Sequence, residues 1–140
     1  MSETHFVTDI DEELADRIVS VSRTSLGDSL RSVLYFTPSA FDVLYVRQDL
    51  YESPEQARPI KEPLVEFEQV GFAEAPVRTA VSTREESSIG PYEFTVRFHS
   101  DGFVLRAIEG DDGVVLTTDS MDVTAFEEAF SAIRRLLAEE

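Results

Sequence analysis

The feature that most limits the possible folds is a run of three short strands and two tight turns near the C-terminus. Residues 92–99 alternate apolar and polar side chains, which is typical of a strand with one buried face. Ser100-Asp101-Gly102 predicts a hairpin turn, residues 103–109 a second strand, Asp111-Asp112-Gly113 a second turn, and residues 114–118 a third strand. The pattern predicts an antiparallel meander, and other elements must cover its apolar face.

A helix over residues 122–138 follows the meander and supplies part of that cover. Asp122 is the expected N-cap. The apolar residues that form one stripe at helical spacing are Val123, Phe126, Phe130, Ile133 and Leu137. We therefore expect Phe126 and Phe130 to be buried against the sheet.

The N-terminal part of the chain predicts a helix and then a hairpin. The helix is expected over residues 10–25, with Asp9 as N-cap and Gly27 just past its end. Residues 32–37 and 41–47 are rich in aromatic and β-branched residues, which favour strands, and Pro38-Ser39-Ala40 separates them as a turn.

The middle of the chain contains several prolines, which makes its pattern harder to interpret. Pro59 and Pro63 are expected to break a long helix, so residues 48–63 predict a turn or a short helix. A second helix is expected over residues 62–71. Residues 77–83 are rich in Val and Thr and predict an edge strand, and residues 84–90 predict a polar loop.

The order of elements is therefore α-β-β-α-(β)-β-β-β-α, which predicts an α+β fold. Its antiparallel sheet has five strands, or six if residues 77–83 add one, with helices packed on it. Residues 1–8 are expected to be a flexible arm and residues 9–140 a single domain. Over residues 9–138 this order resembles the roadblock/LC7 (profilin-like) group. The resemblance implies dimerisation and a scaffold or regulatory role, sometimes toward small GTPases.

A second resemblance rests on a short stretch of sequence. Residues 23–33, Arg-Thr-Ser-Leu-Gly-Asp-Ser-Leu-Arg-Ser-Val, are followed by Tyr35-Phe36-Thr37. This stretch resembles a family of uncharacterised haloarchaeal proteins. The resemblance implies an archaeal origin and no particular activity.

The balance of charge predicts the environment. The chain has 28 acidic and 12 basic residues, a formal net charge of −16, and Lys61 as its single lysine. Self-repulsion of this size destabilises a compact chain in dilute salt, whereas at ~1 M salt the Debye length falls to about 3 Å. We interpret the chain as halophilic; the alternative is an acidic protein from ordinary salt with a charged partner. No clustered basic surface is present to bind nucleic acid.

The composition also excludes several kinds of site. There is no cysteine, and the histidines, His5 and His99, lack the spacing of metal ligands. No phosphate-binding glycine loop or nucleophile motif occurs, so we expect no catalytic, cofactor or metal site and no enzyme. No apolar run is long enough to span a membrane, and the acidic N-terminal residues do not resemble a signal peptide, so a cytoplasmic protein is expected.

The aromatic hairpin and a pair of arginines are the candidate interface residues. The candidates are Tyr35, Phe36, Phe41 and Tyr45, with Arg97 and Arg106. The rings lie on both faces of a short hairpin, so they either form a dimer interface or belong to a sheet covered on both faces. A turn at residues 101–102 brings Arg106 near Arg97. These two arginines either pair with acidic neighbours or contact an acidic partner.

The sequence therefore favours a non-catalytic interaction or regulatory module. We expect a homodimer formed through the hairpin at residues 33–46 and the first helix, and a further protein partner is compatible with this role. One alternative is a small-molecule sensor, which needs a cavity behind the sheet; the residues expected to line it are Phe94, Phe98, Phe103 and Phe126. The second alternative is an enzyme of unknown type.

Overall fold

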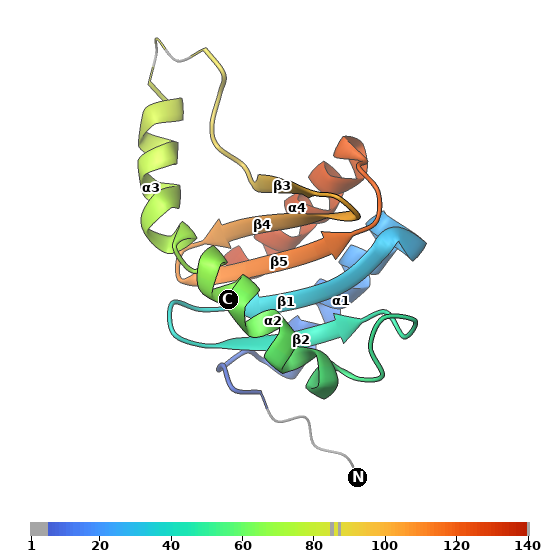
Figure 1. Ribbon diagram of the computed structural model, residues 1–140. Helices are drawn as coiled ribbons and strands as arrows, with labels where there is room; N and C mark the ends of the chain where they lie inside the picture. The colour runs from blue at the N-terminus through green and yellow to red at the C-terminus, as the bar shows by residue number, and fades with distance from the viewer. Residues whose placement is uncertain (1–5, 85, 87, 140) are drawn as a thin grey trace.

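Five antiparallel strands form one sheet in the computed structural model, which describes residues 6–84, 86 and 88–139 (Figure 1). The strands are β1 (Leu30–Phe36), β2 (Phe41–Val46), β3 (Thr95–His99), β4 (Gly102–Glu109) and β5 (Asp112–Thr118). Their order across the sheet is β2-β1-β5-β4-β3, so the N-terminal hairpin joins the C-terminal meander through β1 and β5. The predicted five-stranded antiparallel α+β fold is confirmed.

The two turns of the meander differ in how well the sequence located them. The first turn lies where expected, with His99 opposite Gly102. The second turn is centred on Gly110 and Asp111, not on residues 111–113 as predicted, and Glu109 pairs with Asp112. Gly110 has a φ of +62°, a left-handed conformation that glycine adopts without strain. Gly113 instead lies within β5 beneath the ring of Phe36, where a side chain would clash.

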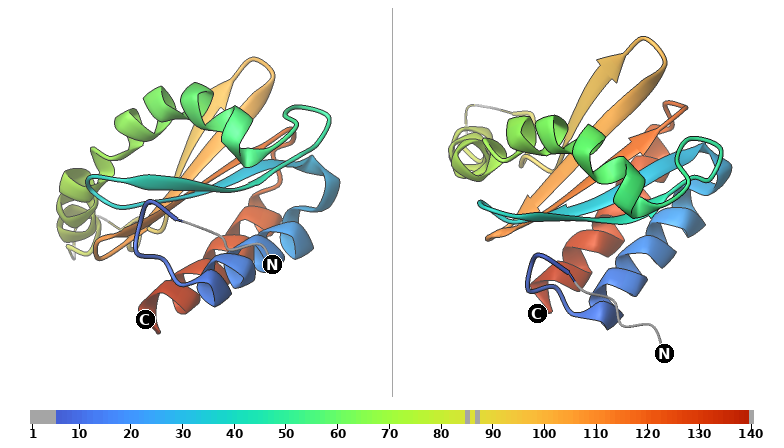
Figure 2. Two further views of the ribbon diagram at one scale, coloured as in Figure 1. Left: turned by 90° about the horizontal axis from the view of Figure 1, so that it is seen from below. Right: turned by 60° about the horizontal axis from the view of Figure 1, so that its bottom comes forward.

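Helices α1 (Glu12–Leu26) and α4 (Val123–Ala138) lie side by side on one face of the sheet (Figure 2). The side chain of Asp122 accepts a hydrogen bond from the backbone of Ala125, as expected of the cap of α4. The cap of α1 is Asp11 rather than the predicted Asp9, because its carboxylate accepts the bond from the backbone of Leu14. The helix therefore begins two residues later than predicted.

The opposite face carries α2 (Pro54–Glu68) and α3 (Gly71–Ser82), and here two predictions were wrong. The helix expected over residues 62–71 begins at Pro54 and runs through Pro59 and Pro63. An interior proline costs a helix about 3 kcal/mol. Both rings are exposed, whereas the opposite side of α2 packs on the sheet, so tertiary contacts maintain the helix.

The segment over residues 77–83, predicted as an edge strand, belongs to α3 instead. Val77 and Val81 are four residues apart and share one helix face. Their β-branched side chains favoured a strand in the sequence analysis, but tertiary context overrides such propensities. The predicted strand over 92–99 also begins later, at Thr95.

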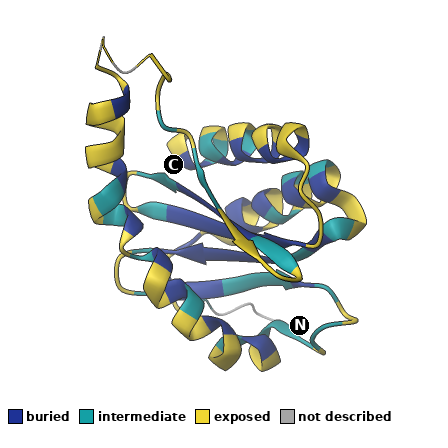
Figure 3. Cartoon of the chain, turned by 45° about the horizontal axis from the view of Figure 1, so that its top comes forward, coloured by how far each residue is buried: buried dark blue, intermediate teal, exposed yellow. Residues whose placement is uncertain are grey.

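Helices cover both faces of the sheet, and each face has its own apolar cluster. The larger cluster lies between the sheet and the pair α1 and α4. The smaller one lies between the sheet and α2 with α3; its buried members are Leu34, Phe36, Phe41, Val65, Val104 and Val115. Figure 3 shows buried residues along the central strands and many exposed residues on α2 and α3. The arrangement matches the interpretation of the aromatic hairpin as part of a two-sided sheet.

Residues 6–8 are the described part of the predicted N-terminal arm; residues 1–5, with His5 among them, lie outside the described residues. The backbone N–H groups of Val7 and Thr8 each donate to the Asp42 carboxylate at 2.8 Å. The Thr8 hydroxyl donates to the same carboxylate at 2.6 Å, and Asp42 is buried. These three bonds attach residues 7 and 8 to β2.

The packing of α4 predicts a large cost for truncating Phe126, which has no exposed surface. Phe126→Ala should lower the free energy of unfolding by about 3–5 kcal/mol, because it leaves a cavity in the larger cluster. Denaturant unfolding in molar KCl measures the change. Val123, the first residue of α4 and the one member of the predicted stripe that is exposed, provides the control. Val123→Ala should alter stability by less than about 0.5 kcal/mol. Equal effects of the two substitutions would contradict this packing.

Candidate interaction surfaces and a buried ion-pair network

Glu68, at the end of α2, binds two arginines of the sheet. Arg106 on β4 donates from Nη1 to Glu68 Oε1 at 3.1 Å, and Arg97 on β3 donates from Nε to Glu68 Oε2 at 2.7 Å. The side chains of Glu68 and Arg106 are each only 1% exposed. A buried charge requires a close partner of opposite sign, so this contact fixes the end of α2 against the two C-terminal strands.

A second carboxylate, Glu74 of α3, completes the network. Arg106 Nη2 donates to Glu74 Oε1 at 2.7 Å and also to the Thr95 hydroxyl at 3.1 Å. Arg78, one turn along α3, lies 3.1 Å from the same carboxylate. Hydrogen bonds from Arg78, and then from Arg106, lower the pKa of Glu74 to about 2. Glu74 therefore stays ionised, and the network connects α2, α3, β3 and β4.

Gly71 at the start of α3 allows Arg106 to take this position. A Cβ atom built on Gly71 would lie 2.7 Å from Cζ of the Arg106 guanidinium. Two carboxylates hold that group, so it has little freedom to move aside. The Nε of Arg106 is a buried donor without a hydrogen-bond partner among the described residues. The turn between α2 and α3 thus requires a residue without a side chain.

The structure brings the two predicted arginines together as the turn at residues 101–102 implied. Both pair with acidic residues of the same chain, as one of the two sequence interpretations had it. Arg106 lies in the interior, whereas the Arg97 side chain keeps 42% of its surface exposed. A role for either arginine in an interface stays a prediction, and within one chain only Arg97 presents surface to a partner.

The four aromatic candidates differ in how far they are buried. Tyr35, Phe36 and Phe41 are buried, and Phe36 meets Phe72 of α3 edge to face with ring centroids 5.3 Å apart. Tyr45 is half-buried, and the Arg23 guanidinium lies 5.1 Å from the centre of its ring. Of the four, Tyr45 alone offers appreciable surface in the single chain. Tyr35 belongs to the larger cluster, whereas Phe36 and Phe41 belong to the smaller one. No local pattern indicated that residues of α2 and α3 would cover Phe36 and Phe41.

More than half of the large apolar side chains that are exposed among the described residues lie on α2 and α3 or shortly after them, and no sequence pattern indicated this. Five of them, here named the apolar strip, are Phe67, Val70, Val77, Val81 and Ile89. Phe67 is 75% and Ile89 83% exposed. All except Phe67 line a groove of about 680 Å³ between α3 and residues 89–92, here named the α3 groove. Figure 1 shows α3 projecting past the β3 edge of the sheet.

The two edges of the sheet are not equally accessible. Arg97, Phe98 and His99 of β3 are exposed, and the ring of Phe98 lies 5.1 Å from that of Phe103 on β4. The other edge, β2, lies against α2 and residues 6–8. Thus β3 is the more open edge.

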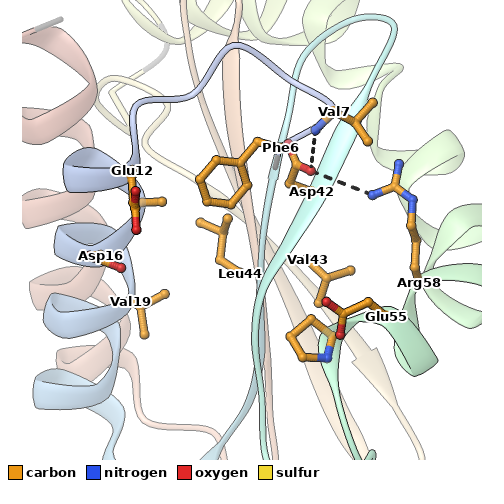
Figure 4. Close-up of a pocket in the computed structure, with 12 residues that line it drawn as sticks. Phe6, Val7, Glu12, Asp16, Val19, Asp42, Val43, Leu44, Glu55 and Arg58 are labelled. Atoms are coloured by element: carbon orange, nitrogen blue, oxygen red, sulfur yellow. Dashed lines mark hydrogen bonds and ion pairs between the residues drawn. The ribbon is translucent and has the colours of Figure 1, made fainter. Parts of the chain in front are cut away.

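A smaller groove of about 320 Å³ lies beside β2, between the first turns of α1 and α2 (Figure 4). Asp42 lies at one end of it, with Arg58 Nη1 3.9 Å from its carboxylate. Arg58 also donates to the Phe41 carbonyl at 2.8 Å and stacks over the Phe41 ring. These groups satisfy one another, so they stabilise the β2 edge.

The predicted sensor cavity does not form from the four rings named for it. Phe126 is fully buried, whereas Phe98 is 72% exposed, so these two rings cannot line one cavity. Phe94 packs against Phe130 with centroids 5.0 Å apart. Within the described residues, no group of three or more His, Asp or Glu side chains could hold a metal ion. No described helix is both long and apolar enough to cross a membrane.

Comparison with known proteins identifies relatives by family and by fold. The family model described as "Domain of unknown function (DUF7522)" matches residues 16–138. No curated protein matches the chain in sequence. Among solved structures, the gliding protein MglB from Thermus thermophilus is similar with a TM-score of 0.56 at 18% identity, over 99% of this chain and 100% of that one.

Two further MglB structures share the fold. One, described as MglB with a tetrameric arrangement, has a TM-score of 0.57 at 16% identity, covering 99% of this chain and 98% of that chain. MglB of Myxococcus xanthus has a TM-score of 0.51 at 8% identity, covering 95% of this chain and 96% of that one. These similarities confirm the roadblock-like fold that the order of elements implied.

The buried network predicts that Glu68 contributes strongly to stability. Glu68→Gln leaves Arg106 with one carboxylate instead of two and leaves Arg97 unpaired. The free energy of unfolding should fall by about 3 kcal/mol, the lower end for a broken buried ion pair, because Glu74 still partners Arg106. Thermal and denaturant unfolding measure the loss. Glu66→Gln, an exposed carboxylate on the same helix, is the matched control, and equal losses in both variants would count against the network.

Proposed function

We propose that this chain, which belongs to the DUF7522 family of domains of unknown function, is a non-catalytic regulatory module that binds other protein chains. Its first partner in this proposal is a second copy of itself. The roadblock-like fold supports the proposal, as does the tetrameric arrangement described for one MglB structure of the same fold. The observation that carries it is the apolar strip along α2 and α3.

The apolar strip contrasts with the rest of the molecule. The chain has a net charge of −16, yet residues 69–84, which hold three of the five residues of the strip, contain a single acidic residue, Glu74. That carboxylate is already paired with Arg106 and Arg78. Contiguous apolar surface of this kind typically marks a site for another macromolecule or a ligand. The low acid content of this stretch favours contact with another chain there.

The open edge of β3 lies on the side of the sheet past which α3 projects (Figure 1). An edge strand presents unpaired N–H and C=O groups to any strand that approaches. Contact through α3 and β3 would join apolar burial with backbone hydrogen bonds. This placement replaces the hairpin and first helix as the proposed dimer surface, because three of the four hairpin rings are buried within the chain. A stable interface of this type buries at least about 1,000 Å² in total.

A high-salt cytoplasm is part of the proposal. Twenty-eight acidic residues and one lysine are expected of a protein that remains soluble in molar salt. At ~1 M salt the Debye length is about 3 Å, so two strongly anionic copies can approach without long-range repulsion. Short-range apolar contact then determines association.

A small-molecule sensor is the second candidate, and the α3 groove is the observation that favours it. Its volume of about 680 Å³ is in the range of ligand pockets, and its lining is largely apolar. Tyr92 and the Glu74–Arg78 pair supply polar groups at its wall. A ligand there would occupy the surface that the homodimer needs, so one set of variants tests both candidates.

The homodimer predicts a specific loss of association. Light scattering in molar KCl should give the wild type twice the mass of one chain. Val77→Asp with Val81→Asp should give a single-chain mass, because two carboxylates would be forced into the apolar contact. Val123→Asp is the control, since Val123 is similarly exposed on α4, away from the strip. A wild type that remains monomeric at high micromolar concentration would contradict the homodimer and favour the small-molecule sensor.

The halophilic interpretation predicts a dependence of stability on salt. The thermal midpoint should rise steeply from dilute to molar KCl, because screening reduces repulsion among the acidic residues. Sodium chloride at matched ionic strength separates screening from effects specific to potassium. A midpoint that is flat or falls over this range would exclude a high-salt interior as the native environment.

A further inference from the structure

Lys61 is placed where a helix normally carries an apolar residue. The residues of α2 that are buried against the sheet are Ala57, Lys61, Val65 and Glu68. Lys61 is the single lysine of the chain, and it is only 9% exposed. Glu68 shares this stripe but is paired with two arginines. Lys61 is thus the second ionisable group of the stripe. Whether its amine is protonated depends on the groups around it.

No carboxylate partners the Lys61 ammonium among the described residues. Its Nζ lies 5.3 Å from the centre of the Tyr51 ring, which is the one polar or charged contact it makes within that part of the chain. The arginines contrast with it, because nine of the eleven form an ion pair with a described Asp or Glu. These are Arg17, Arg31, Arg47, Arg58, Arg78, Arg84, Arg97, Arg106 and Arg134. Within the described part of a chain rich in carboxylates, the buried amine of Lys61 therefore has no carboxylate partner.

A buried ammonium without a counter-charge is unstable and tends to lose its proton. Burial lowers the pKa of Lys61, and the positive charge of Arg31 lowers it further. A desolvated amine next to another cation is the environment in which lysine becomes a nucleophile. The nearby Arg31 is also a fixed cation, paired with Asp119 at 2.8 Å and still 30% exposed.

We propose that Lys61 binds carbon dioxide as a carbamate. The lone pair of the neutral Nζ attacks the carbon of CO₂, and an N–C bond forms. One C=O π bond opens to give a carboxylate oxygen, and the proton from nitrogen passes to solvent. No bond to a leaving group breaks, and no oxidant or reductant is needed. The product is an anion on the side chain where a cation stood.

Two features of the site favour CO₂ over larger electrophiles. With 9% of its surface exposed, Lys61 is easier to reach for a small linear molecule than for a bulky acyl donor. The carbamate would also gain an attractive interaction with Arg31, where the ammonium has a repulsive one. The reaction thus converts an amine without a counter-charge into an anion that the positive charge of Arg31 attracts. This inference does not depend on the proposed homodimer.

The experiment uses the folded chain in molar KCl with carbon-13-labelled bicarbonate at mildly alkaline pH. Carbon-13 NMR should show a carbamate carbon that correlates with the Cε protons of the single lysine. Lys61→Arg and Lys61→Met should each lose that signal completely, while any carbamate at the N-terminal amine persists as an internal reference. Arg31→Gln should reduce the occupancy severalfold, since it removes the neighbouring cation.

Alkylation of the carbamate with triethyloxonium, followed by peptide mass spectrometry, gives a second measurement on the wild type alone. It should place the trapped ester on Lys61, so the test stands even if a variant fails to fold. The absence of a lysine carbamate in the folded wild type by both methods would overturn the proposal. A lysine carbamate that forms only after denaturation would overturn it as well, because the folded environment would then suppress the reaction.

Discussion

The contact between Arg106 and Glu68 determines how half of this molecule is arranged. Arg106 lies in the sheet with its side chain 1% exposed, so carboxylates must reach it from outside the sheet. Glu68 at the end of α2 and Glu74 in the first turns of α3 do so at 3.1 and 2.7 Å. Gly71 between them leaves space for the guanidinium. The direction of α3, and with it the position of the α3 groove, follows from these contacts.

The two faces of the sheet consequently differ in what their buried residues contribute. Between the sheet and α1 with α4 lies an apolar interior, which supplies most of the hydrophobic stabilisation. On the other face a smaller apolar cluster adjoins the buried charges of Arg106, Glu68 and Lys61. Buried charge is a poor source of stability but requires specific partners. The first face makes the fold stable, and the second positions the surfaces proposed here for partners and for carbon dioxide.

The sequence predicted well those elements whose own residues determine their conformation. The stripe that contains Phe126 and Phe130, and the turn at residues 101–102, have no competing interpretation, and both elements formed as expected. The local pattern gave the wrong bounds for α2. Pro59 and Pro63 indicated breaks in the helix, and the side of α2 that faces the sheet includes Lys61 and Glu68 in place of apolar residues. The partner that explains Glu68 is Arg106, 38 positions away. The proximity of Arg97 to Arg106 followed from one turn, but their carboxylates and the apolar strip depended on how α2 and α3 pack.

The strand order has a consequence for how the chain is made. β1 lies between β2 and β5, and Arg31 at its start pairs with Asp119, 88 positions later. A ribosome that has produced the N-terminal hairpin has not yet made the strand that completes the centre of the sheet. The nascent chain therefore holds β1 with one unpaired side and an uncovered apolar surface through most of translation. Exposed apolar surface and an unpaired strand edge favour aggregation, so the first half of the chain is most exposed to it until residues 112–118 have emerged.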